Sequence, residues 1–295
     1  MSGSDERGPG SSPGPAAGDA HDGGERGSLA ALAALRFGAG FVEGEAGLTA
    51  SSRAALGRLL DRRACRRFRR EPIDPALMRL VLATGFAAPS KSDLQQADVV
   101  WVRDPAIRAE VTKGCGDWVV DPETGPAEIL VVCGNGARFA ALFEGGGFPN
   151  DHFDALFNAT GDAAILLSAL VSAAALAGLG SCPISVIRNR AAAVAEALGL
   201  PDRVFPFAGL ALGWPLEPQA PVSARLGPQG ALHIDRFDAA GQAAAVAAYD
   251  ARRADRQTGS DGQPFVWSTA KRRQYGVAQR TDFGAFLRAR GFKME

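Results

Sequence analysis

The spacing of hydrophobic residues predicts helices along much of the chain. Apolar positions recur three and four residues apart, and the runs begin near an N-capping side chain or a proline. One helix is expected after a cap at Thr49, Ser51 or Ser52, and another from Pro75. The apolar faces expected for these two helices comprise Leu56, Leu59 and Leu60 in the first, and Leu77, Leu80, Val81 and Thr84 in the second.

Strands are expected where short runs rich in β-branched residues lie between turn residues. Helices outnumber strands and separate them along the chain, so the pattern indicates one sheet in an α+β or α/β fold. Further helices are expected at 28–37, 162–178 and 191–202 and in an Ala-rich stretch after residue 239. The expected strands are 99–104, 128–134, 204–215 and 231–234, and a loop or lid is expected within 134–158.

The longest uncharged run, residues 163–187, is long enough to suggest a membrane span. Ala and Ser dominate it, and Gly178, Gly180 and Pro183 interrupt it after about 15 helical residues. A buried core helix is therefore the favoured interpretation. Because the helix shows no polar face, it must be covered on all sides, which predicts an obligate dimer.

Composition limits the classes of function. The 295 residues carry 32 basic and 32 acidic side chains, and this balance argues against a nucleic-acid-binding protein. Four cysteines without CxxC spacing predict reduced, mostly buried thiols and a cytoplasmic location. Three ungrouped histidines give no metal site. Residues 1–27 are rich in Gly, Pro and Ser and lack a signal-peptide pattern, so a disordered tail is expected there.

Residues 62–70 contain six arginines in nine positions, within the stretch DRRACRRFRREP at 61–72. Such a cluster is typical of a nucleic-acid patch, a solvated helix face or a clamp for one phosphate. A nucleic-acid patch would need aromatic stacking platforms, and Phe68 is the nearest aromatic residue. The neutral net charge also favours the other two interpretations.

Three segments together resemble the FMN-dependent nitroreductase family. RRACRRF at 62–68, followed by EPI, is similar to its phosphate motif, and APSKSDLQ at 88–95 is similar to a second motif. LAGLGSCPISVIRN at 176–189, LGLPDRVFPFAGLALGWP at 198–215 and ARL at 224–226 resemble its C-terminal half. The likeness is greatest to the NADPH-linked, oxygen-insensitive nitroreductases and flavin reductases. It implies an α+β fold with a central, mainly antiparallel sheet wrapped by helices, and an intertwined homodimer with FMN at its interface.

The resemblance divides the chain into a tail at 1–27, an N-terminal extension at 28–52 and an FMN-binding domain at 53–295. It assigns the FMN phosphate to Arg62, Arg63, Arg66 and Arg225, whose guanidinium groups suit a phosphate dianion. Ala64 stands where the family usually has Ser, so only its backbone N–H remains as a donor there. Arg67, Arg69 and Arg70 have no counterpart and are expected to be solvated.

The other two segments are assigned to the flavin ring and ribityl chain. The resemblance places Ser90, Ser92, Asp93 and Gln95 along them, with Asp93 where many relatives have Asn. It also implies that the backbone of the 183–185 stretch faces the ring near N5. The residues of that stretch are Pro183, Ile184 and Ser185. An ordinary polar loop and an ordinary strand are the simpler interpretations of these segments.

The implied activity is ping-pong hydride transfer from NADPH or NADH through FMN to a nitroaromatic, quinone or flavin. No side chain is expected to act as an obligatory acid or base, because the cofactor performs the chemistry. The relatives' arginines near TGSDGQPF are missing, and the nearest cations are Arg256, Lys271, Arg272 and Arg273. The reductant therefore stays open. Alternatives are a fold relative that dehydrogenates or dehalogenates a biosynthetic substrate, and a non-catalytic flavin sensor.

Overall fold

The structure, a computed structural model, describes residues 28–42, 47–143, 147–259 and 262–295, so the tail predicted at 1–27 lies outside it. Its centre is a four-stranded sheet of order β1-β2-β4-β3 in which every neighbouring pair is antiparallel. The strands are β1 (Ala97–Val102), β2 (Glu128–Asn135), β3 (Gly180–Ile184) and β4 (Val204–Gly213). The antiparallel pairing decides between the two predicted classes in favour of α+β.

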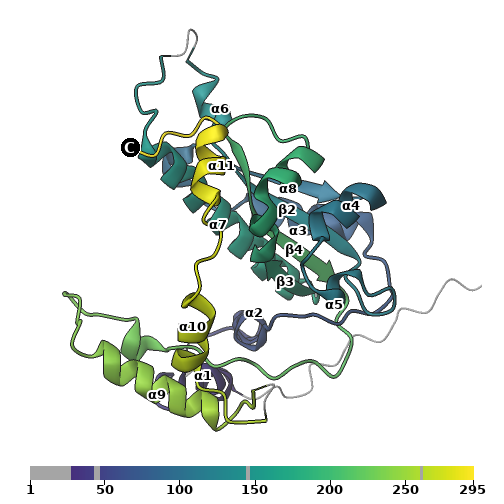
Figure 1. The fold of residues 1–295 in the computed structure, drawn as a ribbon. Coiled ribbons are helices and arrows are strands. Elements are labelled where there is room, and N and C mark those ends of the chain that lie inside the picture. Colours follow the sequence, from purple (N-terminus) through teal and green to yellow (C-terminus); the bar gives the residue numbers. More distant parts are fainter. Residues whose placement is uncertain (1–27, 43–46, 144–146, 260–261) are drawn as a thin grey trace, which may run out of the picture.

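Helices cover both faces of this sheet (Figure 1). Because successive side chains in β2 alternate between faces, Ile129 and Val131 pack in one core and Leu130 and Val132 in the other. The first core is closed by α4 (Pro105–Thr112), α5 (Asp117–Val120), the 3₁₀ segment η3 (Ser185–Arg190) and α8 (Ala191–Ala197). The second is closed by α3 (Pro75–Phe86) and α7 (Phe153–Leu176).

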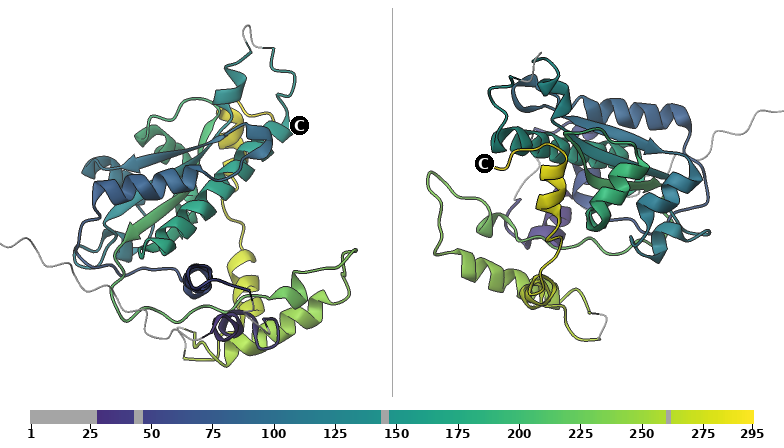
Figure 2. Two further views of the ribbon diagram at one scale, coloured as in Figure 1. Left: turned by 180° about the vertical axis from the view of Figure 1, so that it is seen from behind. Right: turned by 45° about the horizontal axis from the view of Figure 1, so that its top comes forward.

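Among the remaining helices, α1, α2, α9 and α10 lie away from the sheet, whereas α11 lies against the main body (Figures 1 and 2). α1 packs on α2, α9 packs on α10, and the chain then returns so that α11 contacts α8. The bounds of these elements are α1 (Leu29–Phe37), α2 (Ala50–Asp61), η4 (Pro228–Gly230), α9 (Gln242–Ala254), α10 (Trp267–Tyr275) and α11 (Phe283–Ala289). Two short segments, η1 (Lys91–Asp93) and α6 (Ala137–Ala140), complete the described elements.

Local sequence signals explain several helix starts. The side chains of Ser28, Thr49, Asp74 and Asp104 each accept a hydrogen bond from a backbone N–H in the first turn of α1, α2, α3 and α4. Thr49 is thus the cap among the three candidates before α2. The helices expected at 28–37 and from Pro75, and the three longer strands, are confirmed within a few residues.

Some expectations were wrong. Residues 231–234 form no strand, because they lie in an extended loop without a pairing partner. In α3 the buried face is Met78, Val81 and Gly85, whereas Leu80 is 63% exposed. The apolar helix starts at Phe153, inside the expected loop, and Asp162 is buried within it. α7 has the length and composition of a membrane span, but it contacts all four strands, which confirms its place in the core.

An ion-pair cluster fastens the C-terminal segment to the core. Arg203 donates to Asp151 at 2.8 Å, and Lys293 Nζ lies 3.1 Å from the same carboxylate. The hydrogen bond from Arg203, followed by that from Lys293, lowers the pKa of Asp151 to about 2. A carboxyl group with a lowered pKa in the folded state stabilises the protein above its unfolded pKa, and this contribution is lost as the pH falls through the folded pKa.

We expect Asp151→Asn to lower the free energy of unfolding at pH 7 by about 1–2 kcal/mol, a figure reduced for solvent screening. The difference between wild type and variant should shrink as the pH falls from about 4 towards 2, because Asp151 becomes protonated and is then uncharged, like the asparagine of the variant. Urea unfolding at several pH values measures this. A difference that is independent of pH would contradict the assignment.

Candidate functional site

The arginine-rich segment joins the sheet beside β3. Ala64 forms a parallel bridge with Ser181, and the Cys65 N–H donates to the Ser181 carbonyl at 2.9 Å. Two paired glycines permit this approach: a Cβ on Gly180 would lie 2.7 Å from Cys65 Sγ, and one on Gly213 would lie 2.6 Å from Phe68 Cδ1. The first and third sequence segments are therefore brought together within one chain.

Beyond this junction the arginines differ in their surroundings. Arg63 is held by Asp61 and by the Ala220 carbonyl at 3.2 Å. Arg62 and Arg66 make no side-chain hydrogen bond or ion pair with the residues that the structure describes. Burial, and then the positive charge of Arg225, lowers the pKa of Arg62. Arg225 thus lies near Arg62, as the phosphate-clamp hypothesis requires, although about 160 residues separate them in sequence.

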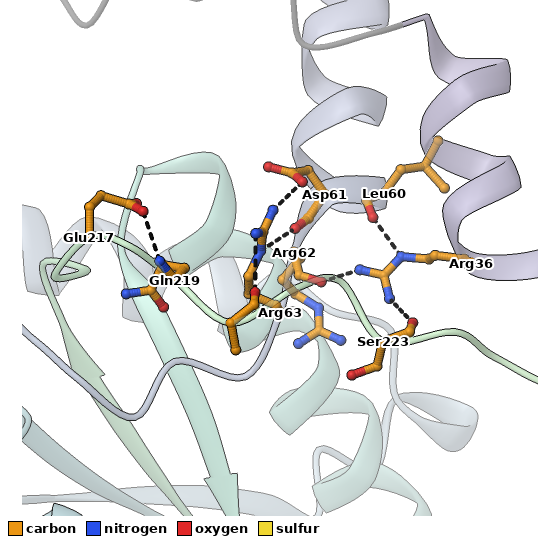
Figure 3. A network of polar contacts seen from close by, with 9 residues as sticks. Arg36, Leu60, Asp61, Arg62, Arg63, Glu217, Gln219 and Ser223 are labelled. Atoms are coloured by element: carbon orange, nitrogen blue, oxygen red, sulfur yellow. Dashed lines mark hydrogen bonds and ion pairs between the residues drawn. The ribbon is translucent and has the colours of Figure 1, made fainter. Parts of the chain in front are cut away.

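Arg36 of α1 joins these arginines, and sequence analysis had missed it. Its guanidinium donates to the carbonyls of Leu60, Arg62 and Ser223 (Figure 3). Its own carbonyl accepts a hydrogen bond from the Arg225 N–H at 2.7 Å. The residue is only 6% exposed. Burial, followed by the charges of Arg225 and Arg62, lowers the pKa of Arg36 to about 10, so it remains charged at neutral pH.

The positive charge of this site exceeds the negative charge beside it. Among the described residues near the site, Asp61 is the carboxylate in contact, and Arg63 occupies it. The charges of Arg225 and Arg62 lower the pKa of Arg36, and the charge of Arg225 also lowers the pKa of Arg62, so the three guanidinium groups lie close together. The Ala64 N–H has no acceptor in the described part of the chain. The unengaged guanidinium groups of Arg62 and Arg66, the Ala64 N–H and this surplus positive charge fit a phosphate dianion, with the Arg225 guanidinium held nearby by the Ala224 carbonyl at 3.1 Å.

The other arginines of the run point to different partners. Arg69 pairs with Glu71 at 3.1 Å and Arg70 pairs with Glu123 at 3.1 Å, and both pairs are well exposed. Arg67 is exposed too. This arrangement agrees with the solvated interpretation of all three.

The stretch expected to face the flavin ring lies on the outer edge of the sheet. Pro183 and Ser185 are exposed, whereas the Ile184 side chain is buried in the core. A proline fits an edge strand because it has no N–H to donate to a further strand. From Pro183 onwards the backbone edge of β3 is therefore available beside the arginines.

The second sequence segment is held in an unusual conformation. Ser92, Asp93 and Gln95 have φ values of +50°, +57° and +50°, which non-glycine residues rarely adopt. The Gln95 N–H donates to Ser90 Oγ at 3.1 Å, and the Gln95 amide donates to Asp93 at 3.1 Å. Such backbone strain is concentrated at binding sites in proteins.

Asp162 of α7 fixes both ends of this segment, which sequence analysis also missed. Its buried carboxylate accepts the Lys91 N–H at 2.9 Å and the Gln96 N–H at 2.8 Å. Ser90, Gln95, Asp162 and Arg138 line a cleft of about 270 Å³. The sequence signal that could have identified Asp162 is its position as an acidic residue at the start of an otherwise uncharged helical run.

The two halves of the expected site do not meet within one chain. The second segment leads into β1 at Ala97. Ala97 pairs with Gly134 of β2, which in turn pairs with Phe205 of β4. The arginine segment joins β3 at the other edge of the sheet, at Ser181, which pairs with Leu212 of β4. Seven residues along β4 and three strand spacings put these points roughly 25 Å apart. One mononucleotide cannot contact both within a single subunit.

Comparison with known proteins identifies the family. The model of the nitroreductase family matches residues 59–214, and that of its C-terminal domain matches 223–295. The chain therefore belongs to the nitroreductase family, an oxidoreductase class, and the resemblance inferred from the three segments is confirmed.

Particular relatives are NADPH-linked reductases. An NADPH-flavin oxidoreductase of Vibrio harveyi is 30% identical over 179 residues, covering 61% of this chain and 72% of the relative. An oxygen-insensitive NADPH nitroreductase of Salmonella typhimurium is 26% identical over 239 residues, covering 79% and 96%. The solved NADPH:FMN oxidoreductase from Vibrio harveyi in complex with NAD+ superposes with a TM-score of 0.68 at 25% identity, covering 80% and 97%.

Proposed function

We propose that the protein is an FMN-dependent enzyme that oxidises NAD(P)H and reduces a nitroaromatic, quinone or flavin acceptor in a ping-pong sequence. Its family and its relatives support an NAD(P)H-dependent oxidoreductase with FMN as cofactor. The observation that supports the proposal most is the convergence of Arg62 and Arg225 at an edge with surplus positive charge.

The FMN phosphate would be held by the guanidinium groups of Arg62, Arg66 and Arg225 and by the Ala64 N–H. Arg63 keeps Asp61 away from the phosphate, because it already pairs with that carboxylate. The edge formed by Pro183, Ile184 and Ser185 would place backbone groups beside the ring. Bound FMN would supply the two-electron hydride chemistry, so the chain need provide only binding, orientation and exclusion of water.

A homodimer would complete the site. In that arrangement Ser90, Ser92, Asp93 and Gln95 of a second subunit would approach the ring from its other side, because these residues lie too far from the arginines of their own subunit. Apolar side chains on the outer face of α7 also support association. Phe157 is 65% exposed and Ile165 is 39% exposed there.

The proposal includes NADPH or NADH as the reductant and a nitroaromatic, quinone or flavin as the acceptor. Arg272 and Arg273 are exposed on α10, where they could approach the phosphate of NADPH. The four cysteines are free and buried, as expected, which supports a cytoplasmic location. A dehydrogenase or dehalogenase of this fold would use the same flavin site with a different acceptor.

Spectroscopy and kinetics test the function. We expect the purified protein to be yellow, to release FMN on heating and to be bleached by NADPH or NADH without oxygen. Addition of a nitroaromatic or quinone should restore the colour, and double-reciprocal plots at several acceptor concentrations should be parallel. Absence of bound FMN would contradict the proposal, and FMN that NAD(P)H fails to bleach would indicate a sensor.

A further inference from the structure

Arg36 is placed where it can determine the geometry of the arginine site. It lies on α1, outside the residues that the two family models match. Its three acceptors belong to two segments that are far apart in sequence: Leu60 and Arg62 at the end of α2, and Ser223 beside Arg225. A further hydrogen bond, from the Arg225 N–H to the Arg36 carbonyl, joins α1 to the second of these segments.

The hydrogen bonds of Arg36 are all directed to carbonyl groups. No carboxylate of the described residues forms an ion pair with it, although it is buried beside two further arginines. Burial of a cation without an ion-pair partner is costly, and here the hydrogen bonds to three carbonyls offset part of that cost. The planar guanidinium can hold several acceptors in a rigid arrangement, which a lysine ammonium cannot reproduce.

We infer that Arg36 is a positioning residue for the phosphate clamp, holding the backbone of Arg62 and the segment of Arg225 at a spacing suited to one phosphate. The inference rests on the proposed FMN function. It assigns a role to the N-terminal extension, whose helix α1 brings this side chain to the site. Arg36 acts through Arg62 and Arg225 and is not itself assigned a contact with the reacting atoms.

Titration of the apoprotein with FMN and with riboflavin, which lacks the phosphate, tests this role. We expect Arg36→Met to raise the Kd for FMN at least tenfold and to change the Kd for riboflavin by about twofold or less. Arg36→Lys should raise the Kd for FMN as much as Arg36→Met does, because lysine keeps the charge but lacks the planar guanidinium. The lysine variant also tests the positioning role if Arg36→Met fails to fold. Arg58→Met is the matched control, since Arg58 of α2 donates to a carbonyl of α7, Leu176, at 2.8 Å.

Three results would overturn the inference while leaving the proposed function intact. They are an unchanged Kd for FMN in Arg36→Met, an equal loss of FMN and riboflavin affinity, and full recovery in Arg36→Lys. The second would indicate general disruption of the site, and the third would indicate a charge effect without positioning. A wild-type protein that binds no FMN would overturn the proposed function, and this inference with it.

Discussion

Replacement of Arg225 with alanine is expected to weaken FMN binding about ten- to a hundredfold. A hydrogen bond to a charged group is worth about 1.5–3 kcal/mol, which corresponds to that range of affinity. Arg62→Ala and Arg66→Ala should have similar effects, because neither guanidinium is engaged by the described residues. Equilibrium titration of each apoprotein with FMN, followed by flavin fluorescence, measures the three losses.

The neighbouring arginines provide the control for this prediction. Arg67→Ala, Arg69→Ala and Arg70→Ala should change FMN affinity by about twofold or less, since exposed charge pairs contribute less than about 1 kcal/mol. A nucleic-acid patch would give another pattern, in which every arginine of the run contributes and Arg225 does not. Equal losses across residues 62–70 with a silent Arg225→Ala would therefore refute the phosphate clamp.

Introduction of a charge on the outer face of α7 is expected to separate the subunits and release the flavin. Phe157 and Ile165 lie on this face, and Leu80 and Phe86 of the adjacent α3 are 63% and 53% exposed. Ile165→Asp would bury an unpaired carboxylate in the interface, at a cost of several kcal/mol. Because the two halves of the site lie on opposite edges of the sheet, a monomer should also lose most of its FMN affinity.

Light scattering at micromolar concentration together with FMN titration tests this second prediction. Val120→Asp is a suitable control, because Val120 is an exposed apolar residue of α5, on the other face of the sheet. A monomeric wild-type protein that retains FMN would contradict the dimeric site. So would an Ile165→Asp variant that is monomeric yet binds FMN as tightly as the wild type.

The sequence by itself determined most of the local elements and the residues proposed for a phosphate site. Helix caps such as Thr49 and the period of the apolar residues act over a few positions, so they can be recognised without a structure. The arginine segment and the ARL segment were likewise recognisable from the chain alone, and so was the family. The apolar face of α3 was predicted wrongly, because which side of a helix is buried depends on its contact with α7.

Only the tertiary structure decided how these parts are combined. Arg36 and Ser223 are 187 residues apart in sequence, and no local pattern predicts their contact. The same holds for Asp162, whose carboxylate fixes the ends of a loop 66 and 71 residues away. The pairing order of the strands put the two halves of the expected site on opposite edges of the sheet. The physical reason is that strand pairing and buried polar contacts depend on which surfaces the folded chain brings together, whereas caps and periodicity depend on neighbouring residues.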